Sequence, residues 1–238
     1  MYPSYGYGYG FGMDPMMILI LLAFGLSLWA SFRVRGTFNR FSQVRAASGM
    51  TGYDAARRML DLNGLYDVQI EPVPGTLTDH YDPIKRVVRL SEPVYYESSI
   101  SAISVACHEI GHAIQHKESY PMLVARHRMF PVVNFASCAS PFLMLAGVLF
   151  GSLNLVWIGI IFFAAAVAFQ LVTLPVEFNA TNRAKKLMVA EGFIDLREKP
   201  GVDRVLNAAA LTYVAAALIS LLQLLRFVMI FGNNRNND

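Results

Sequence analysis

Residues 105–116 read Val-Ala-Cys-His-Glu-Ile-Gly-His-Ala-Ile-Gln-His, and the rest of the chain is organised around them. The stretch contains the pattern H-E-x-x-H, in which His108 and His112 are four residues apart and Glu109 follows the first histidine. Positions i and i+4 of an α-helix share a face, so both imidazoles can bind one metal ion. Glu109 lies about 100° round the helix. From there its carboxylate can reach a water molecule on that ion and act as a general base.

The residues around this motif favour a helix. Residues 101–106 are small or apolar, and Ser98 or Ser99 can cap the start. The first proline that follows is Pro121, so we expect the helix to end between Lys117 and that residue. A chance occurrence of the pattern is the alternative. However, two imidazoles and a carboxylate in an apolar helix are costly to bury unless they are paired or bind metal. We therefore predict one zinc ion.

The composition predicts a membrane protein. Hydrophobic residues make up 55% of the chain and charged residues only 16%, and the apolar residues come in long runs. The net charge of +3 is small, and we expect no nucleic-acid partner. Cys107 lies in the motif helix and Cys138 in an apolar run, so reduced thiols are the simpler interpretation than a disulfide framework.

Uncharged stretches long enough to cross a bilayer predict about four transmembrane helices. They are residues 15–32, a helical hairpin at 130–176, and a last span at 205–231 that contains Gln223 and Arg226. Arg226 either extends towards the headgroups or faces the bundle. Residues 1–14 form a Gly/Tyr-rich tail, and residues 232–238 form a second tail.

The lysines and arginines predict the orientation in the membrane. Residues 33–129 hold twelve of them and residues 183–204 hold six, out of twenty in the chain. Because short cytoplasmic segments are rich in Lys and Arg, both segments are expected in the cytoplasm and both termini outside. We expect a multi-pass protein of the bacterial plasma membrane, in contact with the lipid bilayer.

Residues 33–129 predict a small α+β, zincin-like metallopeptidase domain. A helix is expected after Thr51 as cap, with Gly64 as stop, and short strands at 66–73 and 86–91. Such a sheet can hold an extended substrate at its edge. Residues 75–83 are predicted as a loop, in which His80 is more simply a solvated histidine than a substrate contact.

A catalytic zinc usually takes three protein ligands, so one more is needed. His116 lies a further turn along the helix, beyond the reach of the same ion. Glu177 is the better candidate, because it follows Pro175 at the start of the charged segment 177–204, on the same side of the membrane as the motif.

Several motifs together resemble one family, the YugP-like bacterial membrane zinc metallopeptidases. They are Leu-Thr-Asp-His-Tyr-Asp-Pro at 77–83, Leu-Ser-Glu-Pro at 90–93, the motif at 107–116, and Pro-Val-Glu-Phe-Asn-Ala at 175–180. The resemblance covers nearly the whole chain. It implies a gluzincin-type site, with zinc on His108, His112 and Glu177 and with Glu109 as the base.

The chain is similar, more distantly, to membrane gluzincins of the HtpX type. Those carry an aspartate four residues after the glutamate ligand, and it orients a ligand histidine. Thr181 stands at that position here. The support must therefore differ, through Asn179 or Thr181. The group that polarises the substrate carbonyl stays open among four residues: Arg183, His116, His127 and Tyr120.

These features predict an endopeptidase that acts on peptides or membrane proteins at the cytoplasmic membrane surface, in quality control or regulated processing. The alternative is a non-catalytic, zinc-bearing membrane scaffold that docks a partner protein, but a structural zinc site has no use for Glu109. A transporter is disfavoured because the spans carry almost no polar residues. A homo-oligomer and an unknown partner membrane protein both stay open.

Overall fold

The computed structural model describes residues 15–235; the Gly/Tyr-rich tail at 1–14 and the last residues, 236–238, lie outside the described part. The helices are α1 Pro15–Ser42, α2 Gly52–Leu62, α3 Glu92–Tyr96, α4 Ile100–Lys117, α5 Pro121–Leu149, α6 Leu153–Ala190 and α7 Lys199–Arg235. The strands are β1 Gln69–Val73, β2 His80–Asp82 and β3 Val87–Ser91.

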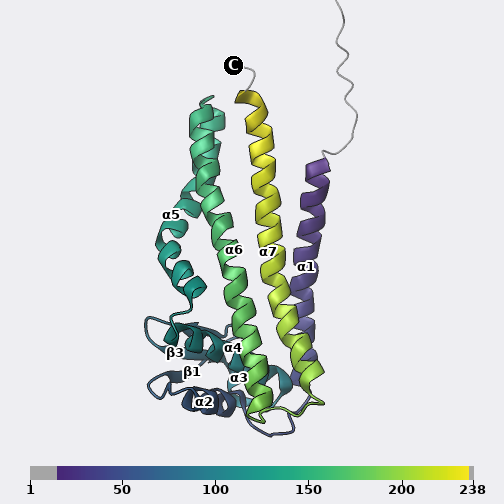
Figure 1. Ribbon diagram of the computed structural model, residues 1–238. Coiled ribbons are helices and arrows are strands. Elements are labelled where there is room, and N and C mark those ends of the chain that lie inside the picture. Colours follow the sequence, from purple (N-terminus) through teal and green to yellow (C-terminus); the bar gives the residue numbers. More distant parts are fainter. Residues whose placement is uncertain (1–14, 236–238) are drawn as a thin grey trace, which may run out of the picture.

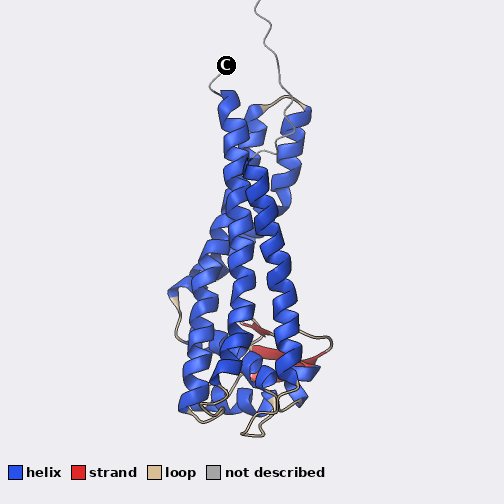
Figure 2. Ribbon diagram, turned by 90° about the vertical axis from the view of Figure 1, so that its right-hand side faces the viewer, coloured by secondary structure: helices blue, strands red, loops and turns tan. Residues whose placement is uncertain are grey.

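The long helices α1, α5, α6 and α7 form an elongated bundle, and the short elements gather at one end of it (Figure 1). We call this the sheet end, because all three strands lie there (Figure 2). The opposite, hairpin end holds the turn between α5 and α6, the start of α1 and the end of α7. Both described chain ends therefore lie on the side away from the sheet.

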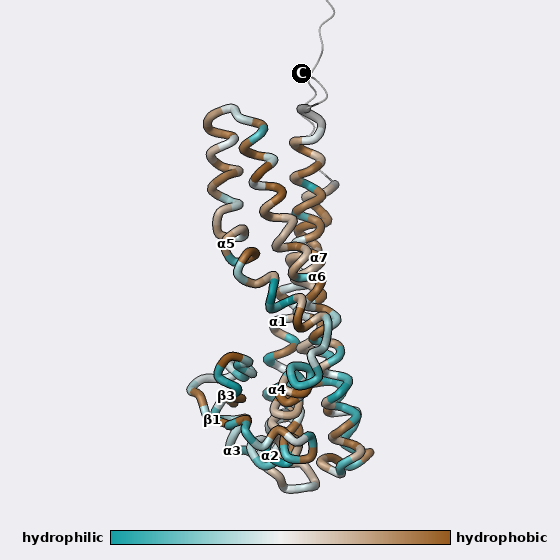
Figure 3. Tube along the Cα trace, turned by 60° about the vertical axis from the view of Figure 1, so that its left-hand side comes forward, coloured by the Kyte–Doolittle hydropathy of each residue, from teal (hydrophilic) through white to brown (hydrophobic). Residues whose placement is uncertain are grey.

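Four helices are long and apolar enough to cross a membrane, namely α1, α5, α6 and α7. Figure 3 shows hydrophobic residues along these helices towards the hairpin end and more hydrophilic residues around the sheet end. The helices run past the predicted spans: α1 continues to Ser42, α6 passes through Pro175 to Ala190, and α7 begins at Lys199. Hydropathy predicts where a helix leaves the lipid, not where the helix ends. Because Lys, Arg and Glu are good helix formers, the helices continue into the charged segments.

The caps of the shorter helices follow the sequence. Thr51 caps α2 through a capping box with Asp54, and Gly64 has a φ of 64°, which glycine adopts without a steric penalty. Ser99 caps α4, because its side chain accepts a hydrogen bond from the backbone N–H of Ala102. Of the two cap candidates for the motif helix, the structure uses this one.

The sheet has the order β1-β3-β2, with β1 parallel and β2 antiparallel to the central strand. The predicted first strand begins at Gln69 rather than at residue 66, because residues 66–67 belong to a turn. The predicted loop at 75–83 is wrong at its end. There His80–Asp82 forms β2 by pairing with Arg89–Val87. The outer edge of β2 has no paired strand among the described residues.

One hydrophobic core joins the sheet end to the long helices. It contains Met59 of α2, Val88 of β3 and Ile103 of α4, together with Met188 of α6 and Leu206 of α7, all 0–2% exposed. Each such side chain contributes about 1.5–3 kcal/mol by its burial. The sheet-end parts of α6 and α7 thus belong to the small domain, because their side chains pack in its core.

Candidate active site

The motif helix α4 lies at the centre of the sheet end. It packs against α2, α3, α6 and α7, and most of its residues are buried. Its buried face includes Glu109, which is 8% exposed, next to His108 and His112, which are partly exposed. The two imidazole rings are 4.9 Å apart and nearly perpendicular. One turn of α4 therefore presents two ring nitrogens and a carboxylate to the same side.

A glycine inside the motif lets α6 come close to this turn. A Cβ atom at Gly111 would lie 2.7 Å from the carbonyl oxygen of Ala180 and 3.1 Å from its Cα. Backbone atoms cannot move aside as a flexible side chain can, so only glycine allows this approach. The contact brings Glu177 and Thr181, which are four residues apart and therefore share a face of α6, against the histidines of α4.

Glu177 completes a cluster that fits a metal ion. Its Oε2 lies 3.4 Å from Nε2 of His108 and 3.6 Å from Nε2 of His112. Ligand atoms at about 2.05 Å from a tetrahedral zinc are about 3.3 Å apart. One ligand atom from each of the three residues lies within 4.8 Å of the others.

The burial of Glu177 supports the same fit. The residue is 3% exposed, and its Oε2 is one of three buried side-chain atoms without a hydrogen-bond partner in the described part of the chain. An ionised carboxylate in this position is costly unless a positive charge compensates it. Arg126 lies 3.6 Å from the other carboxylate oxygen, Oε1, but Oε2 has no partner, and a cation between the three side chains would compensate it.

The electrostatics of the site are negative. Burial opposes a charge on the His112 imidazole, but the Glu177 and Glu109 carboxylates outweigh it and raise the pKa of His112 above its usual value. Asp79 faces the same cavity. Burial raises the pKa of its carboxyl to about 6, against the hydrogen bonds from Ser91, and nearby Glu109 adds to the rise. Such a field attracts a cation.

Polar partners orient both histidines. Thr181 Oγ lies 3.2 Å from Nδ1 of His108, and the side-chain oxygen of Gln115 lies 3.0 Å from Nδ1 of His112. Gln115 in turn donates to the carbonyl of Val176 and to Asn179. With both Nε2 atoms directed at the cluster, each Nδ1–H can donate to these oxygens and fix the ring. Both residues that the sequence offered for orienting the histidines take part: Thr181 contacts His108 directly, and Asn179 is linked to His112 through Gln115.

The cluster opens into a cavity of about 720 Å³, which we call the active-site cavity. The side of the small domain contributes Asp79, His80, Tyr81 and Ile84, and α4 contributes Glu109 together with the two histidines. The long helices contribute Phe130, Phe169 and Tyr213. His80, predicted as a solvated loop residue, is exposed but lies in β2 and lines this cavity.

Two residues near Glu177 were not predicted. Arg126 of α5 lies 3.6 Å from Oε1 of Glu177, and the Tyr213 side chain of α7 lines the cavity close to Glu177 and Glu109. Both come from helices distant in sequence from the motif. A charged residue just before a span and a tyrosine inside one are the only sequence signals, and neither is specific.

The four candidates for polarising the substrate carbonyl separate in the structure. His116 and His127 line the active-site cavity, with rings 6.3 Å apart, and His116 Nδ1 lies 2.9 Å from the Tyr81 hydroxyl. Arg183 instead pairs with Glu118 at 2.6 Å, and Tyr120 does not line the cavity. Burial, aided by Arg86, lowers the pKa of His116.

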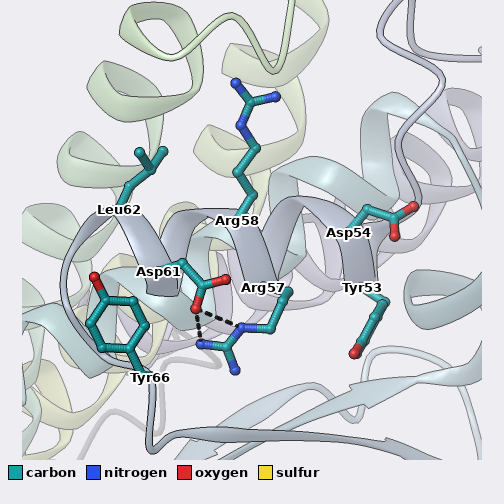
Figure 4. A pocket seen from close by; sticks show the side chains of 7 residues that line it. All are labelled: Tyr53, Asp54, Arg57, Arg58, Asp61, Leu62 and Tyr66. Carbon is teal, nitrogen blue, oxygen red and sulfur yellow. Dashed lines mark hydrogen bonds and ion pairs between the residues drawn. The ribbon is translucent and has the colours of Figure 1, made fainter.

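A separate pocket on α2 contains none of the residues of the metal cluster. It is lined by Tyr53, Asp54, Arg57, Arg58, Asp61, Leu62 and Tyr66 (Figure 4). Its charged groups are already engaged: Arg57 pairs with Asp61 at 2.6 Å, the Asp54 carboxylate accepts hydrogen bonds from the backbone N–H and hydroxyl of Thr51, and Arg58 stacks on Phe193. It shares no residue with the metal cluster, so we assign it no catalytic role.

The fold and the cluster define a membrane protein with the ligand set of a zinc peptidase, and comparison with known proteins agrees. The chain belongs to the family described as "Putative neutral zinc metallopeptidase", whose sequence model matches residues 16–232. It is 65% identical over 222 residues to the "Putative membrane protease YugP" of Bacillus subtilis (strain 168), which covers 93% of this chain and 99% of that protein. The predicted resemblance is thereby confirmed. No solved structure matches the chain.

Proposed function

We propose that the protein is a zinc-dependent endopeptidase of the gluzincin type, which hydrolyses peptide bonds at the membrane surface. One zinc ion would be held by His108, His112 and Glu177. When bound, zinc supplies a polarised carbonyl and a water of lowered pKa. The observation that carries the proposal is the convergence of these three ligand atoms beside Glu109 in one open cavity.

The residues of the chain have separate roles in this reaction. The Glu109 carboxylate accepts a proton from the attacking water and passes it to the nitrogen of the leaving amine. Thr181 and Gln115 hold the two histidines in orientation. Arg126 and Tyr213 lie beside Glu177, and the Tyr213 hydroxyl, which lines the same cavity, would donate a hydrogen bond to the substrate carbonyl oxygen.

The walls of the active-site cavity support a membrane-associated substrate. On one side lies the edge strand β2, which can pair with an extended peptide. On the other side lie Phe130 and Pro131 of α5 and Phe169 of α6, within two of the candidate spans. A segment bound along β2 would lie next to the membrane boundary, as a tail or loop of a membrane protein does. Quality control or regulated processing of such proteins fits this arrangement.

The distribution of positive charge supports an active site in the cytoplasm. Eighteen of the twenty lysines and arginines lie at 33–129 or 183–204, the segments around the sheet end. Both described chain ends lie at the hairpin end, away from them. Because short cytoplasmic segments are rich in Lys and Arg, this distribution supports an orientation with both termini outside the plasma membrane.

The alternative is a zinc-bearing scaffold that docks a partner protein. An enclosed four-ligand site would favour it, because structural zinc is normally fully coordinated by protein. Here only three ligand groups converge, they face an open cavity, and the Glu109 carboxylate lines the same cavity. This arrangement favours hydrolysis.

The test is metal content and proteolysis of the purified wild type and Glu109→Gln in detergent, with casein as an unfolded substrate. We expect one equivalent of zinc in both proteins and cleavage only by the wild type. Casein cleavage by Glu109→Gln would contradict the role of this residue. Zinc in both proteins without cleavage in either would favour the scaffold.

A further inference from the structure

A second cavity, of about 240 Å³, adjoins the active-site cavity. We call it the α1–α7 cavity, because these two helices, which pack against each other, form much of its wall. The two cavities share Asp79, His108, Glu109 and Tyr213. These four residues therefore separate the two cavities, and each cavity reaches His108 and Glu109.

The position of this cavity along α4 identifies which part of a substrate it faces. It is lined by Val105, His108 and Glu109, whereas His112 and Glu177 line only the active-site cavity. It therefore lies on the Glu109 side of the metal cluster. Since Glu109 returns its proton to the leaving amine, the residue that supplies this amine must lie on the same side.

The lining of the α1–α7 cavity is mostly aliphatic. Its aliphatic residues are Val34 of α1, Leu77, Val105 of α4, and Val205, Leu206 and Ala209 of α7, and Thr212 of α7 adds one hydroxyl. Its charged lining groups are Asp79 and Glu109, two carboxylates that disfavour an acidic side chain. Asp79 does not present a free partner to a basic side chain either. Both of its oxygens accept hydrogen bonds from Ser91, at 2.7–3.1 Å.

We propose that the α1–α7 cavity is a substrate subsite, which binds an aliphatic side chain on the residue whose amide nitrogen leaves. The inference rests on the proposed function. It assigns a specificity role to two membrane helices that hold no metal ligand, and it names the substrate class: peptide bonds that precede leucine, isoleucine, valine or methionine.

Ala209 is the residue with which to test this subsite. It is the smallest side chain in the aliphatic lining, so Ala209→Phe fills the cavity and Ala209→Leu fills it in part. Leu218→Phe is the matched control, because Leu218 lies on the same helix, is 38% exposed on the bundle surface and lines neither cavity. Zinc content and thermal unfolding show that each variant is folded and loaded.

Casein products identify the preference directly, because mass spectrometry reads the new N-terminal residue of each fragment. We expect wild type and Leu218→Phe to release fragments that begin with aliphatic residues. For Ala209→Phe we expect a shift of at least about tenfold towards glycine, alanine and serine, the scale on which a pocket discriminates single methylene groups. Ala209→Leu should fall between them.

Unchanged N-termini in the folded Ala209→Phe variant would overturn the proposal. So would wild-type fragments that begin mainly with charged residues. If the wild type cleaves nothing, the proposed function fails, and binding tests the cavity instead. Fluorescence anisotropy with Glu109→Gln would compare labelled peptides that differ only by leucine or glycine at one position. Equal affinity for the two peptides would overturn the subsite, whereas tighter binding of the leucine peptide, abolished by Ala209→Phe, would support it.

Discussion

Helix α6 meets its neighbours through glycines at both of its ends, and the two contacts have different consequences. At the hairpin end, a Cβ atom at Gly159 would lie 2.5 Å from the side chain of Met144 in α5. At the sheet end, a Cβ atom at Gly111 of α4 would meet the backbone of Ala180 at 2.7 Å. The first contact packs two candidate membrane spans, and the second brings Glu177, a proposed metal ligand, to His108 and His112. The same kind of close helix approach thus contributes to the candidate site only at Gly111, where both helices carry residues of the metal cluster.

The largest effect should follow from removing the ligand itself. Glu177→Ala takes away the one carboxylate among the three proposed ligands, and we expect zinc affinity to fall by more than about 100-fold and casein cleavage to disappear. Gln170→Ala changes a polar residue two turns nearer the hairpin end that does not line the active-site cavity, and it should retain both. Metal analysis after dialysis measures the difference. Full zinc occupancy in Glu177→Ala would remove this residue from the site.

The glycine contacts themselves provide the next test. In Gly111→Ala the added methyl group meets backbone, so α6 must shift and Glu177 must move away from His108 and His112. Overpacking of this kind destabilises by about 1–3 kcal/mol, and zinc affinity should fall with it.

Gly159→Ala is the matched change at the hairpin end, where Met144 Cγ is the nearest atom, although the Met144 backbone nitrogen follows at 3.0 Å. We expect it to lower the unfolding temperature but to leave zinc affinity and cleavage near the wild-type values. Equal loss of zinc in both variants would show that the two ends of α6 are not independent.

The sequence predicted the sheet end better than its surroundings, for physical reasons. H-E-x-x-H, the serine and threonine caps and the strand alternation are local patterns, and each acts within a few residues. Glu177 could be predicted because it follows an apolar run and is polar. The ends of the long helices could not be predicted, because hydropathy shows only where charged residues begin. Helix α6 remains helical through Pro175 and Lys185.

The contacts around the cluster depend on helix packing over long sequence distances. Tyr213 lies more than a hundred residues after Glu109, and Arg126 resembles any basic residue before a span. Gln115 was within the quoted motif, but its role depends on Val176 and Asn179 of α6. The close approach at Gly111 creates these contacts, and one sequence alone does not specify where it occurs.

Two buried threonines on α6 offer a finer comparison. Thr181 contacts His108 of α4, whereas the Thr173 hydroxyl donates to the carbonyl of Phe169 within its own helix, at 2.9 Å. Thr181→Val should reduce zinc affinity or cleavage by about 10–100-fold, because the ring of His108 loses its partner. Thr173→Val should change neither. Thr181→Ser restores a hydroxyl and should recover most of the activity, which a purely steric role for Thr181 would not explain.

The last comparison concerns stability rather than zinc binding, through ionisation at the sheet end. The pKa of Asp79 is raised to about 6, above the unfolded value of about 3.9. A raised pKa means that stability from the neutral carboxyl is present below pH 4 and is lost as the pH rises through 6. Relative to Asp79→Asn, which stays neutral, metal-free wild type should therefore lose up to about 3 kcal/mol between pH 4 and 8.

Asp82 in β2 is the control, because its shift has the opposite sign. Backbone N–H groups of Lys85 and Ile84 and the Arg89 guanidinium lower the pKa of this carboxyl, which favours its ionised form in the folded protein. Asp82→Asn should therefore be less stable than wild type at pH 8 and close to it at low pH, the reverse of Asp79→Asn. Thermal unfolding of the three metal-free proteins across this range measures both trends. Parallel curves for the two variants would show that burial beside Glu109 does not control Asp79, and the sheet end would then lack the electrostatic character that distinguishes it from the hairpin end.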